Sequence, residues 1–129
     1  MTPPYTRKKL TDVEDSAPKF GLGENQQARF ANRDLETEDT GVSLHRLDSG
    51  RRSAFGHRHE QAEEVYVVVA GSGRMKLDEE IVELEAMDAI RVAPGVVRAF
   101  EGGPGGIEVL AFGPRHEGDG ELLPGWWQD

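Results

Sequence analysis

Apolar and polar residues alternate with a period of two through most of the central part of the chain. Successive side chains of a strand point to opposite faces, so this alternation predicts half-buried β-strands. Within residues 63–70, apolar and aromatic side chains run without a break from Val65 to Val69, which indicates a strand buried on both faces. We expect further strands at 42–48, 53–59, 74–77, 81–84, 87–92, 96–101 and 107–112.

Short turn-forming stretches separate the predicted strands. They lie at residues 49–50, 71–73, 78–80, 94–95 and 102–106, and most contain glycine or proline. The sequence between them lacks the 3.6-residue periodicity of an amphipathic helix. About eight short strands at close, regular spacing predict an all-β fold, either an antiparallel sandwich or a barrel.

The two ends of the chain differ from this centre. A chain of 129 residues is long enough for one domain with its own core. We expect an extended N-terminal arm at 1–27, a barrel at 28–112 whose first eight residues form a strand or a short helix, and a tail at 113–129. Trp126 and Trp127 predict that the tail packs on the barrel or on a partner subunit.

Composition and charge exclude several classes of protein. The chain has no cysteine, so it has no disulfide or thiolate chemistry, which fits the reducing cytoplasm. The N-terminus has no apolar run of the kind found in signal peptides, and no segment is long enough to span a membrane. The formal net charge of −9 disfavours nucleic acid. We therefore expect a cytoplasmic protein that binds neither nucleic acid nor membrane.

One histidine pair is the strongest candidate for chemistry. His57 and His59 are two residues apart on a predicted strand, so their side chains share a face. Glu64 can join them if the next strand pairs back beside them. Two imidazoles and one carboxylate suit a first-row divalent metal. Strand parity does not choose between Glu63 and Glu64 as the carboxylate, whereas His45 and His116 are expected to have no special role.

The spacing around these residues resembles the cupin superfamily. The first cupin motif is matched, with one extra residue after its leading glycine, by Gly50, His57, His59, Glu64 and Gly71. The stretch 94–100, which opens with Pro-Gly, is similar to the second motif, and the resemblance covers about residues 41–112. It implies a double-stranded β-helix or jelly-roll barrel, often dimeric, with its functional site inside the barrel mouth.

The resemblance also implies roles for individual residues. His57, His59 and Glu64 match the usual ligands of a divalent metal such as iron, manganese, nickel or zinc. The fourth ligand, a histidine in the family, is Arg98 in this chain. Arginine stays protonated and has no lone pair to donate. At roughly 5 Å and an effective dielectric of about 20, it repels a dication by on the order of 6 kcal/mol.

Two arrangements of Arg98 are open. In one, its side chain folds into the barrel, pairs with Glu64 and fills the cation site itself. In the other, it swings toward the mouth and leaves a three-ligand metal site with open positions. We favour the second arrangement, in which the site holds three ligands or is weakly occupied.

Three hypotheses for function follow. The first is a metal-dependent enzyme, of oxygenase or isomerase type, in which Arg98 anchors an anionic substrate and Tyr66 and Phe100 contact it or fill the barrel. The second is a metal-free module that binds a small anion, with the arginine replacing the charge of the metal. The third is metal-free acid–base catalysis by His57 or His59. A homodimer is expected from the arm, the tail and the apolar outer face of strand 63–70.

Overall fold

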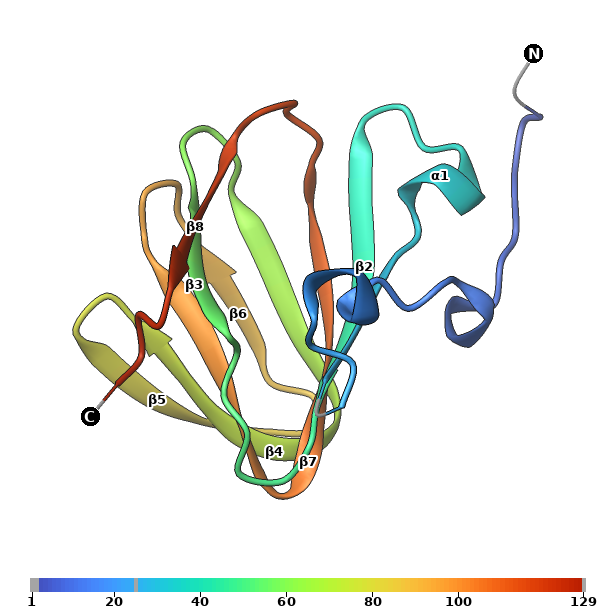
Figure 1. Ribbon diagram of the computed structural model, residues 1–129. Helices are drawn as coiled ribbons and strands as arrows, with labels where there is room; N and C mark the ends of the chain where they lie inside the picture. The colour runs from blue at the N-terminus through green and yellow to red at the C-terminus, as the bar shows by residue number, and fades with distance from the viewer. Residues whose placement is uncertain (1–2, 25, 129) are drawn as a thin grey trace.

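The computed structural model describes residues 3–24 and 26–128, and its eight strands form one curled sheet with antiparallel pairing (Figure 1). The predicted all-β class is confirmed. In chain order the elements are the 3₁₀ turns η1 Leu10–Asp12 and η2 Ala17–Phe20, then β1 Gln26–Phe30, α1 Asn32–Leu35, β2 Thr40–Leu47, β3 Phe55–His59, β4 Glu64–Leu77, β5 Glu80–Glu85, β6 Ala89–Val92, β7 Arg98–Pro114 and β8 Gly120–Pro124.

Two long strands, β4 and β7, form the centre of the barrel. They pair with each other antiparallel over most of their length, from Val65 opposite Phe112 to Leu77 opposite Arg98. The first residue of β7 also pairs with β3, and its second half pairs with β2. Because the two ends of one long strand bind different neighbours, β2 and β3 lie on opposite sides of the interior (Figure 1).

The turns predicted at 71–73 and 102–106 are wrong, because both segments lie inside continuous strands. The two glycine-rich segments pair with each other, with Gly71 opposite Ile107 and Gly73 opposite Gly102, and the register shifts beside them. Gly71 has φ +75, and a Cβ atom there would lie 2.1 Å from the Gly106 carbonyl oxygen. The glycines therefore permit a close, bulged crossing of two strands rather than a chain reversal.

The ends of the chain lie against this sheet. β1 extends the sheet beside β2, and Asp15 Oδ1 accepts hydrogen bonds from the backbone N–H groups of Ala17 and Ala28. β8, which the sequence did not predict, pairs with β3. Trp126 packs over Gly56, and Trp127 is only 6% exposed.

The core fills the interior between β4, β7 and their neighbours. Its largest fully buried apolar side chains include Met75, Ile107 and Val68.

The outer face of β4 was one reason to expect a homodimer. Val69 on this face is 37% exposed, and the homodimer stays a prediction. Within the described residues, no helix is long and apolar enough to cross a membrane.

Candidate metal centre

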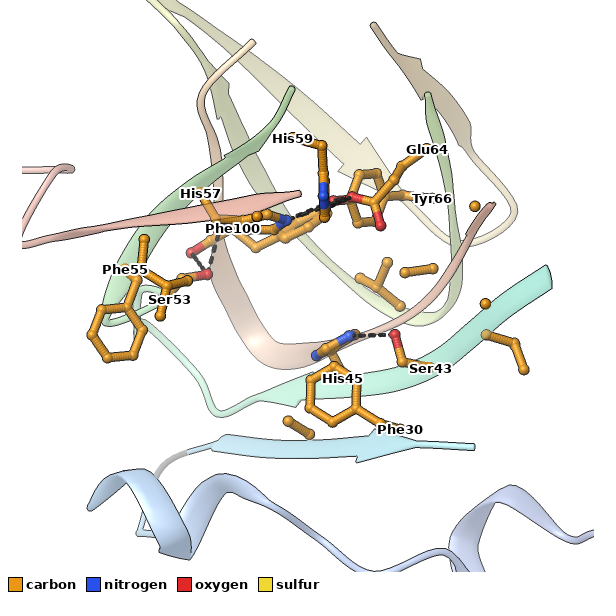
Figure 2. Close-up of a pocket in the computed structure, with 18 of the residues that line it drawn as sticks. Phe30, Ser43, His45, Ser53, Phe55, His57, His59, Glu64, Tyr66 and Phe100 are labelled. Atoms are coloured by element: carbon orange, nitrogen blue, oxygen red, sulfur yellow. Dashed lines mark hydrogen bonds and ion pairs between the residues drawn. The ribbon is translucent and has the colours of Figure 1, made fainter. Parts of the chain in front are cut away.

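His57, His59 and Glu64 converge inside the barrel (Figure 2). β3 presents both histidines from one face, with ring centroids 5.3 Å apart, and Glu64 is the first residue of β4. Glu64 Oε1 lies 3.5 Å from His57 Nε2 and 3.1 Å from His59 Nε2. One candidate ligand atom from each residue lies within 4.8 Å of the others. We call these three residues the triad.

The structure also decides between the two neighbouring glutamates. Glu63 is exposed and forms an ion pair with Arg91 at 3.2 Å on the outside of the barrel. Glu64 points the opposite way, and its side chain is only 17% exposed. Adjacent residues at the start of a strand face opposite sides, so only one of them can join the histidines.

Arg98 is fully buried, and its guanidinium turns toward Glu64. Nη2 donates to Glu64 Oε1 at 2.8 Å, Nε donates to the Tyr66 hydroxyl at 3.1 Å, and Nη1 donates to the Val96 carbonyl at 2.7 Å. The expectation that Arg98 swings toward the mouth is therefore wrong. Three acceptors around the planar fork satisfy it inside the barrel, where an unpaired guanidinium would be costly. Its predicted role in anchoring a substrate stays a prediction.

Tyr66 ties the arginine to the triad. Its hydroxyl donates to Glu64 Oε1 at 2.6 Å and lies 3.3 Å from His57 Nε2, and its ring packs edge-on against Phe100. Burial, followed by the neighbouring carboxylate, raises the pKa of Tyr66, so its hydroxyl keeps its proton. Burial alone would raise the pKa of Glu64. Hydrogen bonds from His57, His59 and Tyr66 outweigh it, so the pKa of Glu64 lies well below its usual range.

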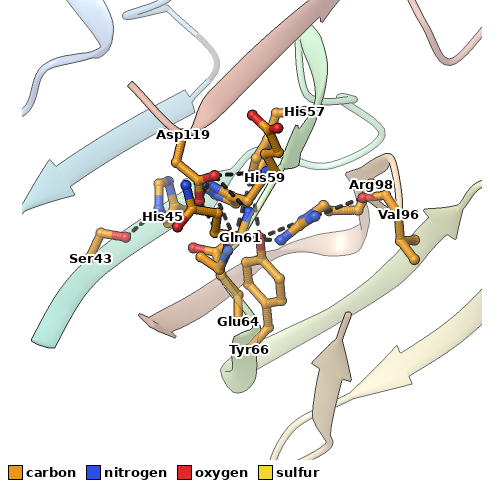
Figure 3. A network of polar contacts seen from close by, with 12 residues as sticks. Ser43, His45, His57, His59, Gln61, Glu64, Tyr66, Val96, Arg98 and Asp119 are labelled. Carbon is orange, nitrogen blue, oxygen red and sulfur yellow. Dashed lines mark hydrogen bonds and ion pairs between the residues drawn. The ribbon is translucent and has the colours of Figure 1, made fainter. Parts of the chain in front are cut away.

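Asp119, in the tail just before β8, lies beside His59 (Figure 3). It accepts hydrogen bonds from the backbone N–H groups of Glu60, Gln61 and Ala62, which form the connection between the two ligand strands. Burial opposes ionisation of Asp119, but these three donors hold its pKa below the usual value. Its Oδ2 atom lies 3.3 Å from His59 Nδ1, at ion-pair distance.

A cavity of about 890 Å³ opens beside the triad. The triad residues, Tyr66 and Phe100 line the cavity. Arg98 contacts Glu64 but is not among the described residues that line the cavity. Ser43 and His45 of β2 line it as well (Figure 2). A volume of this size suits a small organic molecule.

Comparison with known proteins adds the family. A family model described as "Cupin domain" matches residues 43–109, more than half of the chain. The chain belongs to the cupin family. The predicted barrel is thereby confirmed, and solved cupin structures agree with it. No curated protein matches.

The solved structures share the fold at low sequence identity. A cupin protein from Bacteroides fragilis is 23% identical, with a TM-score of 0.72 over 97% of this chain and 92% of its own. A cupin-superfamily sugar phosphate isomerase from Silicibacter pomeroyi is 14% identical, with a TM-score of 0.72 over 93% of both chains. The polyketide cyclase RemF from Streptomyces resistomycificus is 17% identical, with a TM-score of 0.74 over 96% of this chain and 87% of its own.

The donor set of this cupin fits a divalent metal. Two imidazole nitrogens and a carboxylate oxygen are the ligands of the 2-His-1-carboxylate sites that hold first-row metals. The ligand side chains of the triad remain partly exposed, with 33% for His57, 22% for His59 and 17% for Glu64, so an ion can reach them. The neighbouring guanidinium opposes a dication but leaves these three donors together.

Sequence reasoning missed three residues near the site. Asp119 lies in a turn-rich tail, and no local pattern marks it as a neighbour of His59. Ser43 and His45 alternate along β2 in the same way that the ligand histidines alternate along β3, and this shared parity was the available signal.

Proposed function

We propose that this cupin binds a divalent metal ion through His57, His59 and Glu64 and holds a small anionic organic ligand in the adjoining cavity. The observation that carries the proposal is the convergence of three ligand atoms within 4.8 Å at the wall of a cavity of about 890 Å³. When bound, such an ion acts as a Lewis acid that orients and polarises an oxygen ligand.

Neighbouring residues hold the side chains of the triad in position and keep its carboxylate ionised. Tyr66 and Arg98 both donate hydrogen bonds to Glu64 Oε1, so the carboxylate is ionised and fixed in position. Asp119 holds the backbone between the ligand strands and lies beside His59. Positioning of ligands by such outer contacts is general in metal sites. The apolar part of the cavity wall would exclude water from a bound ligand.

Metal titration with a matched pair of variants tests the proposal. Protein freed of metal with a chelator would be titrated with zinc, manganese, nickel and, without oxygen, ferrous iron, and the bound metal would be measured by elemental analysis. We expect about one ion per chain in the parent protein and in Glu63→Gln, which changes an exposed carboxylate. Glu64→Gln should weaken binding at least tenfold, because it replaces an anionic ligand by a neutral amide.

Failure of the parent protein to bind any of these metals would refute the proposed metal site. Equal losses in Glu63→Gln and Glu64→Gln would also count against it, since the exposed residue cannot reach the triad. An oxygenase or isomerase type of reaction is a separate expectation. The isomerase and cyclase among the structural neighbours support it only in that barrels of this shape host enzymes.

A metal-free module that binds a small anion is the second candidate. It is favoured by the burial of Arg98 at the position of the fourth ligand and by its 2.8 Å contact with Glu64. This candidate predicts that the parent protein binds no metal, whereas Arg98→His does. Equal metal binding by the two proteins would exclude it.

A further inference from the structure

A second polar pair lies in the cavity, apart from the triad. Ser43 and His45 are two residues apart on β2 and share the inward face of that strand, which lies across the cavity from β3 (Figure 2). Ser43 Oγ and His45 Nε2 are 2.8 Å apart, and Ser43 is 8% exposed. A hydrogen-bonded pair at this depth is a fixed polar group rather than a mobile surface contact.

One nitrogen of His45 is left for a ligand. Among the described residues, the only hydrogen bond of His45 is the one between Nε2 and Ser43 Oγ, so Nδ1 has no protein partner. Phe30 packs edge-on against the ring, with centroids 5.5 Å apart, and restricts its rotation. His45 lines the cavity, and a polar atom without a protein partner at such a place is satisfied by water or by a bound molecule.

The surroundings of His45 define what kind of group it would bind. Burial, followed by repulsion from His57, lowers the pKa of His45 to about 4, so the imidazole is neutral near pH 7. A neutral imidazole cannot balance the charge of a second anionic group on the ligand. Its Nδ1 atom donates or accepts according to the tautomer, and a hydroxyl group can satisfy it in either case because it does both.

The space around the pair is largely apolar. Phe100, Val109 and Ala111 line the cavity floor, and Phe30 and Leu122 line it with about half of their surfaces exposed. A bound molecule would therefore contact the triad at one end and apolar walls along its body. In sites of this kind, a few polar groups fix the orientation of the ligand and apolar contacts provide much of its affinity.

We propose that Ser43 and His45 form a second recognition point, which binds a hydroxyl group of an organic ligand whose anionic end lies at the triad and whose body is apolar. The anionic end rests on the proposed function, but the hydroxyl contact does not. The ligand class is thus a hydroxylated, largely apolar organic acid, such as a hydroxyaryl or long-chain hydroxy acid.

Matched pairs of probes test the hydroxyl contact directly. Phenylpropionate and phenylpentanoate would each be compared with their para-hydroxyl derivatives by calorimetric titration, because the two chain lengths sample different spans of the cavity. In the parent protein the hydroxyl group of at least one pair should strengthen binding about fivefold to tenfold, the usual worth of one neutral hydrogen bond. Measurements on zinc-loaded and on metal-free protein separate this contact from metal binding.

Two variants assign the preference to His45. His45→Leu replaces the imidazole by an apolar side chain of similar size, and it should abolish the hydroxyl preference, so that the two probes of each pair bind equally well. His45→Gln keeps a neutral hydrogen-bonding group and should retain part of the preference. Thermal melting shows whether each variant is folded, and an unchanged zinc affinity in His45→Leu shows that the triad is intact.

Several outcomes would overturn the proposal. They are a preference that survives in His45→Leu, no preference in the parent protein with either pair, and no measurable binding of any probe in either metal state. Failure of the proposed function is a different result, since it is read from zinc binding alone. A parent protein that binds no zinc but prefers the hydroxylated probe would support the role of His45 and refute the metal site.

Discussion

Replacement of Arg98 by histidine and by leucine separates two ways in which this arginine weakens a metal site. Residue 98 lies directly opposite His57 in the β3–β7 pairing, so a histidine there would lie beside a candidate ligand. Arg98→His removes the guanidinium and adds a possible ligand, whereas Arg98→Leu removes the guanidinium, with its charge and its hydrogen bonds, and adds no ligand. The ratio of the two affinities measures the added ligand, and the gain in Arg98→Leu measures the charge.

The structure gives the size of the charge effect. Arg98 Nη2 lies 2.8 Å from Glu64 Oε1, so the guanidinium is one hydrogen bond away from a ligand atom. For a dication at about 5 Å and an effective dielectric of about 20, the repulsion is about 6–7 kcal/mol. The guanidinium charge is delocalised and the cavity admits water, so we expect about half of this or less to be measured. Arg98→Leu should then bind zinc about a hundredfold more tightly than the parent, and Arg98→His more tightly still.

The same substitutions should destabilise the metal-free protein. Removing one partner of a buried ion pair typically costs about 3–5 kcal/mol, because the other charge stays buried. Glu64 keeps its hydrogen bond from Tyr66, so we expect the lower end of that range for Arg98→Leu. Saturating zinc should restore most of the loss, since an ion that binds only the folded state stabilises it in proportion to the logarithm of its concentration over Kd.

Competition titration with a chromogenic zinc chelator gives the affinities, and thermal melting with and without zinc gives the stabilities. Arg91→Leu is the matched control, because it removes an exposed arginine that pairs with Glu63 on the outside of the barrel. Its zinc affinity should equal that of the parent. If Arg98→Leu binds zinc no more tightly than the parent and the control, the guanidinium does not oppose a metal at the triad, and the electrostatic argument is refuted.

Three further perturbations test other parts of the structure. Asp119→Asn can keep Oδ1 for the Glu60 and Gln61 N–H groups, but it removes the acceptor of Ala62 N–H and the charge beside His59. Zinc affinity measured by competition should therefore fall about 10- to 100-fold, and an unchanged affinity would contradict this role. Gly71→Ala should lower the free energy of unfolding, measured by chemical denaturation, by at least about 1–3 kcal/mol. The reason is that a Cβ atom at residue 71 would lie 2.1 Å from the Gly106 carbonyl oxygen. Gly95→Ala, with φ +87 and nothing within 4 Å, should cost less. Hydrogen bonds from Arg74 and Arg52 lower the pKa of Glu101, so the stability that its carboxylate contributes is present at neutral pH and is lost as pH falls below the usual carboxyl range. The difference in Tm between the parent and Glu101→Gln should therefore shrink at acidic pH. A difference that stays constant with pH would contradict this role of Glu101.

The sequence predicted the parts of the site that depend on local alternation. The two histidines share a face because they are two residues apart on a strand, and that strand is present as β3. The motif spacing placed Glu64 beside them. The glycine-rich segments were interpreted wrongly because the conformation of each depends on the other. Gly71 and Gly73 lie in β4, opposite the distant residues Ile107 and Gly102 of β7. The turn propensity of a short segment does not show which distant segment it pairs with.

The rest of the site depends on contacts between distant segments. Asp119 reaches His59 only because β8 pairs with β3, and His45 reaches the cavity only because the sheet curls until β2 lies across from the triad. The arrangement of Arg98 depends on acceptors from two residues of β4 and from its own strand entry. Each of these placements combines tertiary contacts that no single stretch of sequence contains.

Arg98 links the stability of the metal-free barrel to its affinity for metal. Glu64 Oε1 lies within 3.5 Å of four polar groups, namely Nη2 of Arg98, the hydroxyl of Tyr66 and Nε2 of each ligand histidine. In a barrel without metal, the guanidinium is the arginine cation that pairs with the mostly buried Glu64 carboxylate, in addition to the hydrogen bond from Tyr66. When an ion binds, the same guanidinium becomes a second cation beside it and reduces the gain. A histidine at position 98 would reverse both effects. We therefore expect the arginine to make the metal-free protein more stable and to weaken the proposed binding of metal at the triad.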